Sequence, residues 1–234
     1  MVTRSYTVGC IRNRLIARDT WEFLLEKPAG FSFRPGQFLL FKVPLVEDPS
    51  DVQPRAFSIA SAPGEDGLLF VAKMKRGGRA SRWIAELLKE GTKVTMQGPF
   101  GNFLLQQSDH QILFIATSTG VAPFRSMLVQ QQAESEKRKV DLIFGIRGEE
   151  DIFWIHELAK HIPREQIHVT LSQPSDAWTG HRGRVQSLLP SAVPDLAQRS
   201  VYVCGNPDMT KELKRLCLDM WGVAKERLHV EGYI

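Results

Sequence analysis

The pattern of apolar residues changes near residue 110, and this change constrains the fold more than any other feature of the chain. Before that point the apolar runs are short, and turn-forming groups such as Pro28-Ala-Gly30 separate them. Only the stretch 79–89 has helical spacing. Antiparallel strands of this kind lose their exposed edges by closing into a barrel. We therefore expect a six-stranded antiparallel β-barrel with one helix, its strands lying near 6–11, 20–25, 37–43, 56–60, 68–74 and 92–97.

After residue 110, apolar strands alternate with helical stretches near 121–137, 151–161, 184–189 and 207–221. This alternation is typical of a parallel sheet with helices on both faces. We expect a five-stranded parallel α/β domain with strands at 112–116, 140–146, 167–171, 200–204 and 227–231. The polar, unpatterned segment 105–110 separates the halves and predicts domains over 1–106 and 107–234.

The composition, 43% apolar and 24% charged, is that of a soluble globular protein. No apolar run reaches the length of a membrane span, and the first residues do not resemble a signal peptide, so we expect a cytoplasmic protein. Three scattered cysteines are too few for a disulfide framework, a zinc site or an iron–sulfur cluster. His156 and His161 are five residues apart and would diverge on a helix, so we expect no metal.

The formal net charge of +4 falls entirely on the first half of the chain. Residues 1–110 carry 15 Lys/Arg and 11 Asp/Glu, whereas residues 111–234 carry 15 of each. Five of the basic residues cluster within 73–82. The excess is too small for nucleic acid, and no nucleic-acid-binding motif is present. Such a cluster suits the phosphates of a ligand or an acidic protein partner.

A series of short motifs runs along the chain, and each alone is typical of a turn or a helix start. They are Pro54-Arg-Ala-Phe-Ser58, Gly77-Gly-Arg-Ala-Ser81, Gly98-Pro-Phe-Gly101, Thr117-Ser-Thr-Gly-Val-Ala-Pro123, Cys204-Gly-Asn-Pro-Asp-Met209 and Glu231-Gly-Tyr-Ile234. In this order, over nearly the whole chain, they resemble the ferredoxin–NADP reductase superfamily of flavoenzymes. The resemblance implies an FAD-binding barrel over 1–106, an NAD(P)-binding domain over 107–234, and an active site between them.

Arg55, Phe57 and Ser58 match the superfamily motif Arg-x-Tyr-Ser. Strand alternation would place Arg55 and Phe57 on one face and Ser58 on the other. The resemblance implies that Arg55 binds the flavin phosphate, Phe57 packs on the isoalloxazine ring and Ser58 hydrogen-bonds near N5, the redox atom. Phe in place of Tyr keeps the ring contact and removes a hydroxyl.

The glycine pair before the predicted helix is the second flavin feature. Gly77 and Gly78 let a phosphate approach the backbone, and Ser81 lies at the helix start, where an anion is favoured. The superfamily has its flavin pyrophosphate loop at this place, and Lys73 belongs to the same basic stretch. We expect FAD here rather than FMN.

Thr117 to Pro123 follows the first strand of the predicted parallel sheet, where a dinucleotide pyrophosphate binds. The superfamily loop Gly-Thr-Gly-x-Ala-Pro is matched at Thr119 and Gly120, whereas Ser118 replaces its first glycine. The resemblance thus implies that Thr119 and Gly120 bind the nucleotide.

The chemistry at the nicotinamide is assigned to the end of the chain. The resemblance implies that Cys204 orients the nicotinamide without acting as a nucleophile, and that Glu231 is an acid near it. Tyr233 corresponds to an aromatic residue that covers the flavin. Cys10 and Cys217 are expected to pack in the core.

The nucleotide preference is expected to depend on the ends of the second and third parallel strands. Arg147, Ser172 and Arg184 lie there, but no arginine follows the third strand directly, as a 2′-phosphate would require. Trp178, Gly180 and Gly183 match a loop common in NADH-using relatives, which favours NADH slightly.

The expected function is hydride transfer from NAD(P)H to bound FAD, followed by electron transfer to an acceptor. The basic first half favours an acidic acceptor, such as a ferredoxin or the iron–sulfur component of an oxygenase. Two alternatives stay open: a reductase that uses free flavin as a substrate, and a flavin-binding electron-transfer subunit of a larger complex.

Overall fold

The computed structural model describes residues 4–135 and 138–233, and the chain divides into two compact units. Unit 1 comprises Met1–Leu105 and Ala122–Gln130, and unit 2 comprises Gln106–Val121 and Gln131–Ile234. The expected domains 1–106 and 107–234 stay a prediction. The units differ from them mainly at Ala122–Gln130, which packs with the first half of the chain.

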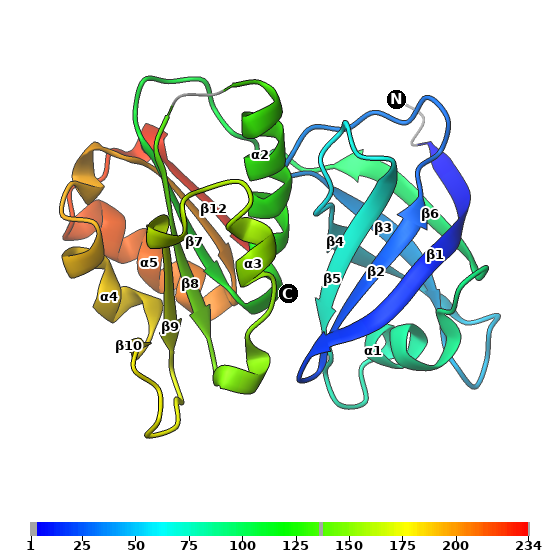
Figure 1. Cartoon of the computed structure of the whole chain (residues 1–234). Coiled ribbons are helices and arrows are strands. Elements are labelled where there is room, and N and C mark those ends of the chain that lie inside the picture. Colours follow the sequence, from blue (N-terminus) through cyan, green and yellow to red (C-terminus); the bar gives the residue numbers. More distant parts are fainter. Residues whose placement is uncertain (1–3, 136–137, 234) are drawn as a thin grey trace. The chain divides into compact units, whose positions relative to one another are not determined.

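Unit 1 is the expected antiparallel barrel (Figure 1). The strand order is β4-β3-β6-β1-β2-β5, and the two edge strands β4 and β5 contact each other without pairing, as the sheet curls into the barrel. All six expected strands are present: β1 (Ser5–Ala17), β2 (Thr20–Glu26), β3 (Phe38–Pro44), β4 (Val52–Ser58), β5 (Gly67–Lys73) and β6 (Lys93–Phe100).

Strand β4 begins earlier than expected, at Val52, and includes Pro54. Proline has no backbone N–H to donate, so it is tolerated on an edge strand that pairs on one side only. β4 pairs only with β3, where Pro54 lies opposite Lys42. The strand therefore extends through this proline, and it begins four residues before the expected start at 56.

The barrel is filled by aromatic side chains. Phe23 stacks on Phe70 with ring centroids 5.2 Å apart, and Phe41 meets Phe70 edge-on at 5.0 Å. Trp83 packs edge-on against Phe23 from the helical segment. That segment is α1 (Arg79–Arg82) continued by a π-helical turn over Trp83–Leu87, and it buries Trp83 and Ile84 in the barrel core.

Unit 2 contains the expected parallel sheet, with strand order β10-β9-β8-β7-β11-β12. Its strands are β7 (Ile112–Thr117), β8 (Val140–Ile146), β9 (Ile167–Leu171), β10 (His181–Arg182), β11 (Ser200–Gly205) and β12 (Leu228–Gly232). Five of them were expected. The structure adds β10, a two-residue edge strand. The sequence did not predict it because two residues are too few to show a hydrophobic period.

The helices of the second half are α2 (Ala122–Ala133), α3 (Ile155–Leu158), α4 (Val185–Ala192) and α5 (Pro207–Asp219). α4 and α5 lie on one face of the sheet (Figure 1) and bury its apolar side chains. On the other face, Phe153 packs edge-on against Phe144. α3 is shorter than the expected 151–161. Trp154 has a left-handed backbone conformation, with φ of 57°, so the helix begins only at Ile155.

A buried ion-pair network lies at the amino ends of the parallel strands. Asp141 accepts a hydrogen bond from Arg199 at 3.0 Å, and both side chains are only 7% exposed. Burial raises the pKa of Asp141, but the hydrogen bond from His168 and the charges of Lys139 and Arg199 outweigh it and hold the pKa below its usual value. The carboxylate is therefore ionised at neutral pH and balances the buried guanidinium.

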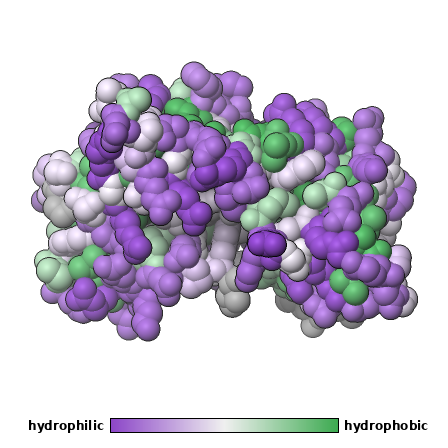
Figure 2. Space-filling view, turned by 90° about the horizontal axis from the view of Figure 1, so that it is seen from below, coloured by the Kyte–Doolittle hydropathy of each residue, from purple (hydrophilic) through white to green (hydrophobic). Residues whose placement is uncertain are grey.

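The face drawn in Figure 2 is covered mainly by hydrophilic residues, with hydrophobic ones scattered among them. The large exposed apolar side chains of the described residues are Ile11 and Leu15, both on β1, and Val52 and Met220. Over residues 4–135 and 138–233, no helix is long and apolar enough to cross a membrane.

Candidate functional site

Strand β4 presents three of the expected site residues. Arg55 lies opposite Phe41, Phe57 opposite Leu39, and Ser58 opposite Phe38 in the β3–β4 pairing. Since residues opposite each other share a face, Arg55 and Phe57 lie on the same face and Ser58 on the other, as alternation predicts.

The Arg55 guanidinium carries a charge that its neighbours do not balance. It donates to the Pro54 carbonyl at 2.7 Å and to Oε1 of Gln53 at 2.9 Å, both neutral acceptors. Within the described part of the chain, no carboxylate lies within ion-pair distance of it. A half-buried cation with neutral partners can pair with a phosphate without first breaking an ion pair.

Phe57 is half-buried and packed against the barrel core. Its ring meets Phe41 edge-on at 5.1 Å and Phe23 edge-on at 5.6 Å. These contacts fix the plane of the ring, while part of the side chain stays accessible. A ring held in this way can receive another aromatic system on its free surface.

The segment Lys75–Ser81 forms a closed loop before α1. The Gly78 N–H donates to the Lys75 carbonyl at 2.9 Å, and the Lys75 N–H donates to Ser81 Oγ at 2.8 Å. Gly77 has φ of +69°, and a Cβ there would meet nothing within 4 Å. The loop therefore has open space above its glycine and a serine that holds its two ends together.

The basic cluster of 73–82 is partly neutralised in the folded chain. Arg79 Nη2 lies 2.6 Å from Asp51 Oδ2, and Arg82 is paired with Glu47 and Glu86. The Arg82 guanidinium holds the pKa of both glutamates below their usual values.

The other three basic residues of 73–82 are exposed. Lys73 Nζ donates to the Arg18 carbonyl at 2.5 Å. Lys75 and Arg76 have no ion-pair partner among the residues that the structure describes. The positive charge of 73–82 that no acid balances therefore rests on fewer residues than the five that the sequence suggests.

In unit 2, the loop after β7 packs backbone to backbone on the end of β11. A Cβ on Gly120 would stand 2.3 Å from the Cys204 carbonyl oxygen, so only glycine fits. The Asn206 N–H donates to Thr117 Oγ1 at 3.1 Å. Ser118 has φ of 50°, a conformation that glycine adopts freely, and this accounts for the glycine that the superfamily has at this place. Thr119 is half-buried in the same loop.

Cys204, Glu231 and Tyr233 gather at the carboxyl ends of β11 and β12. Cys204 lies opposite Glu231 in the parallel pairing, and the Tyr233 N–H donates to the Gly205 carbonyl at 2.8 Å. Burial raises the pKa of the Cys204 thiol well above its usual value, the charge of Glu231 raises it further, and a hydrogen bond with Tyr233 opposes both. The thiol is therefore protonated at neutral pH, which suits packing and orientation rather than nucleophilic attack.

The remaining expected residues lie at the carboxyl ends of β8 and β9. The Ser172 N–H donates to the Ile146 carbonyl and the Gln173 N–H to the Arg147 carbonyl, so Arg147 and Ser172 lie on adjacent strand ends. Arg184 directly precedes α4. Arg147, Ser172 and Arg184 are all exposed at this edge, where parallel sheets bind their ligands.

Two further residues at this edge are held by hydrogen bonds, and the sequence reasoning missed the first of them, Glu149. Glu149 accepts hydrogen bonds from the Ser175 N–H and hydroxyl, at 3.0 and 2.6 Å. Arg182 donates to the carbonyls of Ser175, Asp176 and Trp178 and so closes the loop before β10. Their bonds are to backbone groups and a serine, which no motif signals.

Two further residues tie α2 to the barrel within unit 1. Arg125 and Ser126 hydrogen-bond to the segment that follows β4. In the sequence, this contact was signalled by the single arginine in the apolar run from Val121 to Val129, because a charge on a buried helix face needs a partner. No group of three or more His, Cys, Asp or Glu residues that could hold a metal ion is present in residues 4–135 and 138–233.

Comparison with known proteins assigns each half of the chain to a known domain family. Residues 10–104 match the model of the oxidoreductase FAD-binding domain, and residues 114–215 match that of the oxidoreductase NAD-binding domain. The chain is 34% identical over 224 residues to ferredoxin–NADP reductase B of Sorangium cellulosum, and the match covers 91% of each protein.

Longer relatives also match. The chain is 28% identical to the glycine betaine monooxygenase reductase subunit of Pseudomonas aeruginosa, over 97% of the chain but only 64% of that protein. Among solved structures, a cytochrome P450 reductase from Amycolatopsis is similar at 27% identity with a TM-score of 0.87, covering 98% of this chain and 70% of the other. The ferredoxin–NADP⁺ reductase of Neisseria gonorrhoeae, solved with FAD and NADP, shares the fold at 21% identity with a TM-score of 0.83, over 97% and 98% of the two chains.

The barrel, the parallel sheet, the two matched domains and the full-length relative agree with one another. The chain belongs to the ferredoxin–NADP reductase superfamily and is an FAD-dependent NAD(P)H oxidoreductase.

Proposed function

We propose that β4 holds the FAD through Arg55, Phe57 and Ser58. The observation that carries this assignment is the Arg55 guanidinium, which has only neutral partners and stands on the same face as a half-exposed aromatic ring. Arg55 binds the flavin phosphate, Phe57 packs on the ring and Ser58 donates near N5. The residues fit the group, since a phosphate supplies the anion that Arg55 lacks.

The loop before α1 takes the rest of the flavin pyrophosphate. Gly77 leaves room for a phosphate. Gly78 lets the loop close tightly, since a Cβ there would stand 3.1 Å from the Lys75 carbonyl oxygen, and Ser81 keeps the loop closed through its bond to the Lys75 N–H. Lys73, exposed at the end of β5, adds positive charge.

The carboxyl edge of the parallel sheet holds the nicotinamide nucleotide. Thr119 and Gly120 bind its pyrophosphate, and Arg147, Ser172 and Arg184 bind its adenosine half. Cys204 and Glu231 orient the nicotinamide, with Tyr233 beside them at the end of β12. When bound, NAD(P)H supplies a hydride that FAD accepts.

We favour NADH over NADPH. Arg182, near the adenosine half, already donates to three backbone carbonyls, and Glu149 adds a carboxylate to the same edge. An anionic neighbour disfavours the second anion that a 2′-phosphate would bring.

For the electron acceptor we propose an acidic iron–sulfur protein, a ferredoxin or an oxygenase component. Lys75 and Arg76 are exposed, and no carboxylate of the described residues forms an ion pair with them, so they offer positive charge to such a partner. Added salt should slow turnover with an acidic ferredoxin more than turnover with an uncharged small acceptor such as menadione, because exposed charges are screened within about 10 Å at 0.1 M salt.

The direct test is purification followed by anaerobic titration with NADH and with NADPH. We expect FAD to stay with the protein through gel filtration and NADH to bleach its visible absorbance at lower concentrations than NADPH. Loss of flavin on the column would favour the free-flavin reductase alternative. Retention of flavin without bleaching would favour an electron-transfer subunit. The cytoplasmic location stays a prediction.

A further inference from the structure

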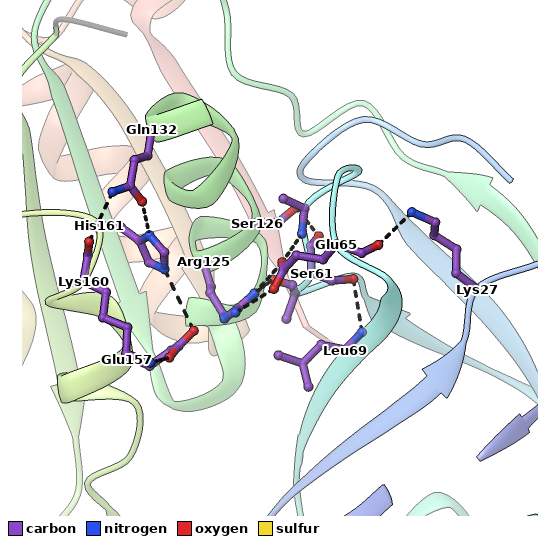
Figure 3. Close-up of polar contacts among 12 residues, drawn as sticks. Lys27, Ser61, Glu65, Leu69, Arg125, Ser126, Gln132, Glu157, Lys160 and His161 are labelled. Carbon is purple, nitrogen blue, oxygen red and sulfur yellow. Dashed lines mark hydrogen bonds and ion pairs between the residues drawn. The ribbon is translucent and has the colours of Figure 1, made fainter. Parts of the chain in front are cut away.

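The segment that follows β4 is held by a helix from elsewhere in the chain. Unit 1 contains Ala122–Gln130 of α2, and two adjacent residues of that helix face the loop 59–66 (Figure 3). Arg125 donates to the Ala60 carbonyl at 2.9 Å, and Ser126 Oγ donates to the Ser61 carbonyl at 2.6 Å. These carbonyls are two and three residues beyond Ser58.

Arg125 also forms a two-point ion pair. Its Nη1 and Nη2 reach the two carboxylate oxygens of Glu65 at 2.9 and 3.0 Å. The Arg125 side chain is only 7% exposed, whereas that of Glu65 is 35% exposed. The planar guanidinium therefore holds both ends of the loop, at Ala60 and at Glu65, in one fixed geometry.

The loop has few other ways to satisfy its polar groups. Glu65 Oε2 accepts from the Ala62 N–H at 2.6 Å, and Lys27 Nζ donates to the Pro63 and Glu65 carbonyls. Ala60, Ser61 and Ala62 are buried, so water cannot replace a lost bond. Removal of the guanidinium would leave the Ala60 carbonyl buried without that donor, and the loop would have to move.

Movement of this loop reaches Ser58 directly. Ser58 is the last residue of β4, and Ile59 and Ala60 continue the ladder through bonds to the Gln37 and Leu69 carbonyls. We propose that Arg125, with Glu65, is a positioning residue for the flavin site: it fixes the backbone after β4 so that Ser58 stands at the flavin. This inference rests on the proposed function, because it takes Ser58 as the residue beside N5.

The test uses the purified flavoprotein with Arg125→Gln, Arg125→Lys and Glu65→Gln. Arg12→Gln is the matched control. Arg12 is exposed and pairs with the buried Glu22 of the same unit, on β1 and β2, which carry no proposed flavin residue, and Arg14 can still balance Glu22. The readouts are hydrogen exchange of the amides of 58–69, the visible circular dichroism of the flavin, and the rate of flavin reduction at saturating NADH in stopped flow.

We expect faster exchange in 58–69 and an altered flavin circular dichroism for Arg125→Gln. We also expect a fall of about tenfold to 100-fold in the reduction rate, since an error of about 1 Å in position can cost that much. The KM for NADH should change by less than about twofold, because an interaction that acts on the transition state alone lowers kcat. Arg125→Lys, which keeps the charge and one donor, should recover part of the rate, and Glu65→Gln should show a smaller loss.

Wild-type exchange in 58–69, or a wild-type reduction rate and circular dichroism in folded Arg125→Gln, would overturn the inference. If Arg125→Gln does not fold, the same criteria apply to Arg125→Lys and Glu65→Gln. Failure of the proposed function is a different result, because the wild-type protein itself would then bind no FAD or fail to reduce it with NAD(P)H.

Discussion

Replacement of Gly120 by alanine should weaken the reaction with NADH and leave the binding of FAD unchanged. A Cβ at this position would lie 2.3 Å from the Cys204 carbonyl oxygen and 2.6 Å from both the Cys204 carbonyl carbon and the Gly205 Cα. Real Cβ contacts essentially never fall below 3.0 Å, and all three neighbours are backbone atoms, so no side chain can rotate away. The loop after β7 and the end of β11 must therefore part by at least 0.7 Å, the difference between 2.3 and 3.0 Å.

This displacement of the loop after β7 from the end of β11 has two measurable consequences. Forcing an extra methyl group into a packed site costs about 1–3 kcal/mol of stability. Displacement of the loop that holds the nucleotide should lower kcat/KM for NADH by up to about 100-fold. FAD content should stay at the wild-type level, because the proposed flavin residues belong to unit 1.

The assay combines urea denaturation with anaerobic flavin reduction over a range of NADH concentrations. Gly148→Ala is the matched control: its Cβ would be 3.4 Å from the Gln173 carbonyl oxygen, an ordinary contact at the same edge of the sheet. We expect it to change stability by less than about 0.5 kcal/mol. A Gly120→Ala protein with wild-type stability and wild-type kcat/KM would refute the reasoning from backbone contact.

Three further predictions concern single side chains. Asp141→Asn should cost about 1.5–3 kcal/mol at pH 7, because it removes one of the two carboxylates that pair with the buried Arg199, and Asp195 remains as the other. Since the pKa of Asp141 is lowered by folding, this contribution is present above the unfolded pKa of about 3.9 and is lost as the pH falls through the folded value. Urea denaturation at pH 7 and pH 3 should therefore show the mutant and wild type converging only in acid, and an equal gap at both pH values would contradict the argument. The Cys204 thiol should react with iodoacetamide much more slowly than a free cysteine between about pH 7 and 9, because burial raises its pKa; mass spectrometry of the folded protein checks this, and rapid labelling would contradict it. Arg55→Gln should raise the Kd for FAD by about 10- to 100-fold, as expected for the loss of charge-assisted hydrogen bonds of about 1.5–3 kcal/mol; fluorescence titration of the apoprotein measures it, and an unchanged Kd would remove Arg55 from the site.

The order of strands and helices could be predicted because its signal is local. Each of the six barrel strands and five of the six parallel strands carries its own apolar pattern, and the structure has a strand at each of these places. The errors occur where the local pattern is weak or overridden. β10 is two residues long, and α3 starts only after Trp154 because of that residue's left-handed backbone.

The electrostatics of the flavin loop could not be predicted from the sequence. Five basic residues within 73–82 read as one positive patch, but Arg79 pairs with Asp51, and Arg82 pairs with Glu47. These acids are 28 and 35 residues earlier in the chain. The pairing depends on how the β3–β4 connection folds back, which no pattern near the cluster encodes.

By itself, the sequence determined the two-part architecture and the family, because hydrophobic periods and short glycine-rich motifs are properties of neighbouring residues. It also showed that Ser118 stands where the superfamily has a glycine, but only the structure shows that this serine has a left-handed backbone. The tertiary structure alone decided which charges are left unbalanced and which helix holds the end of β4. Arg125 meets Glu65 across 60 residues of chain, and a contact at that separation is set by the packing of the whole unit rather than by either segment.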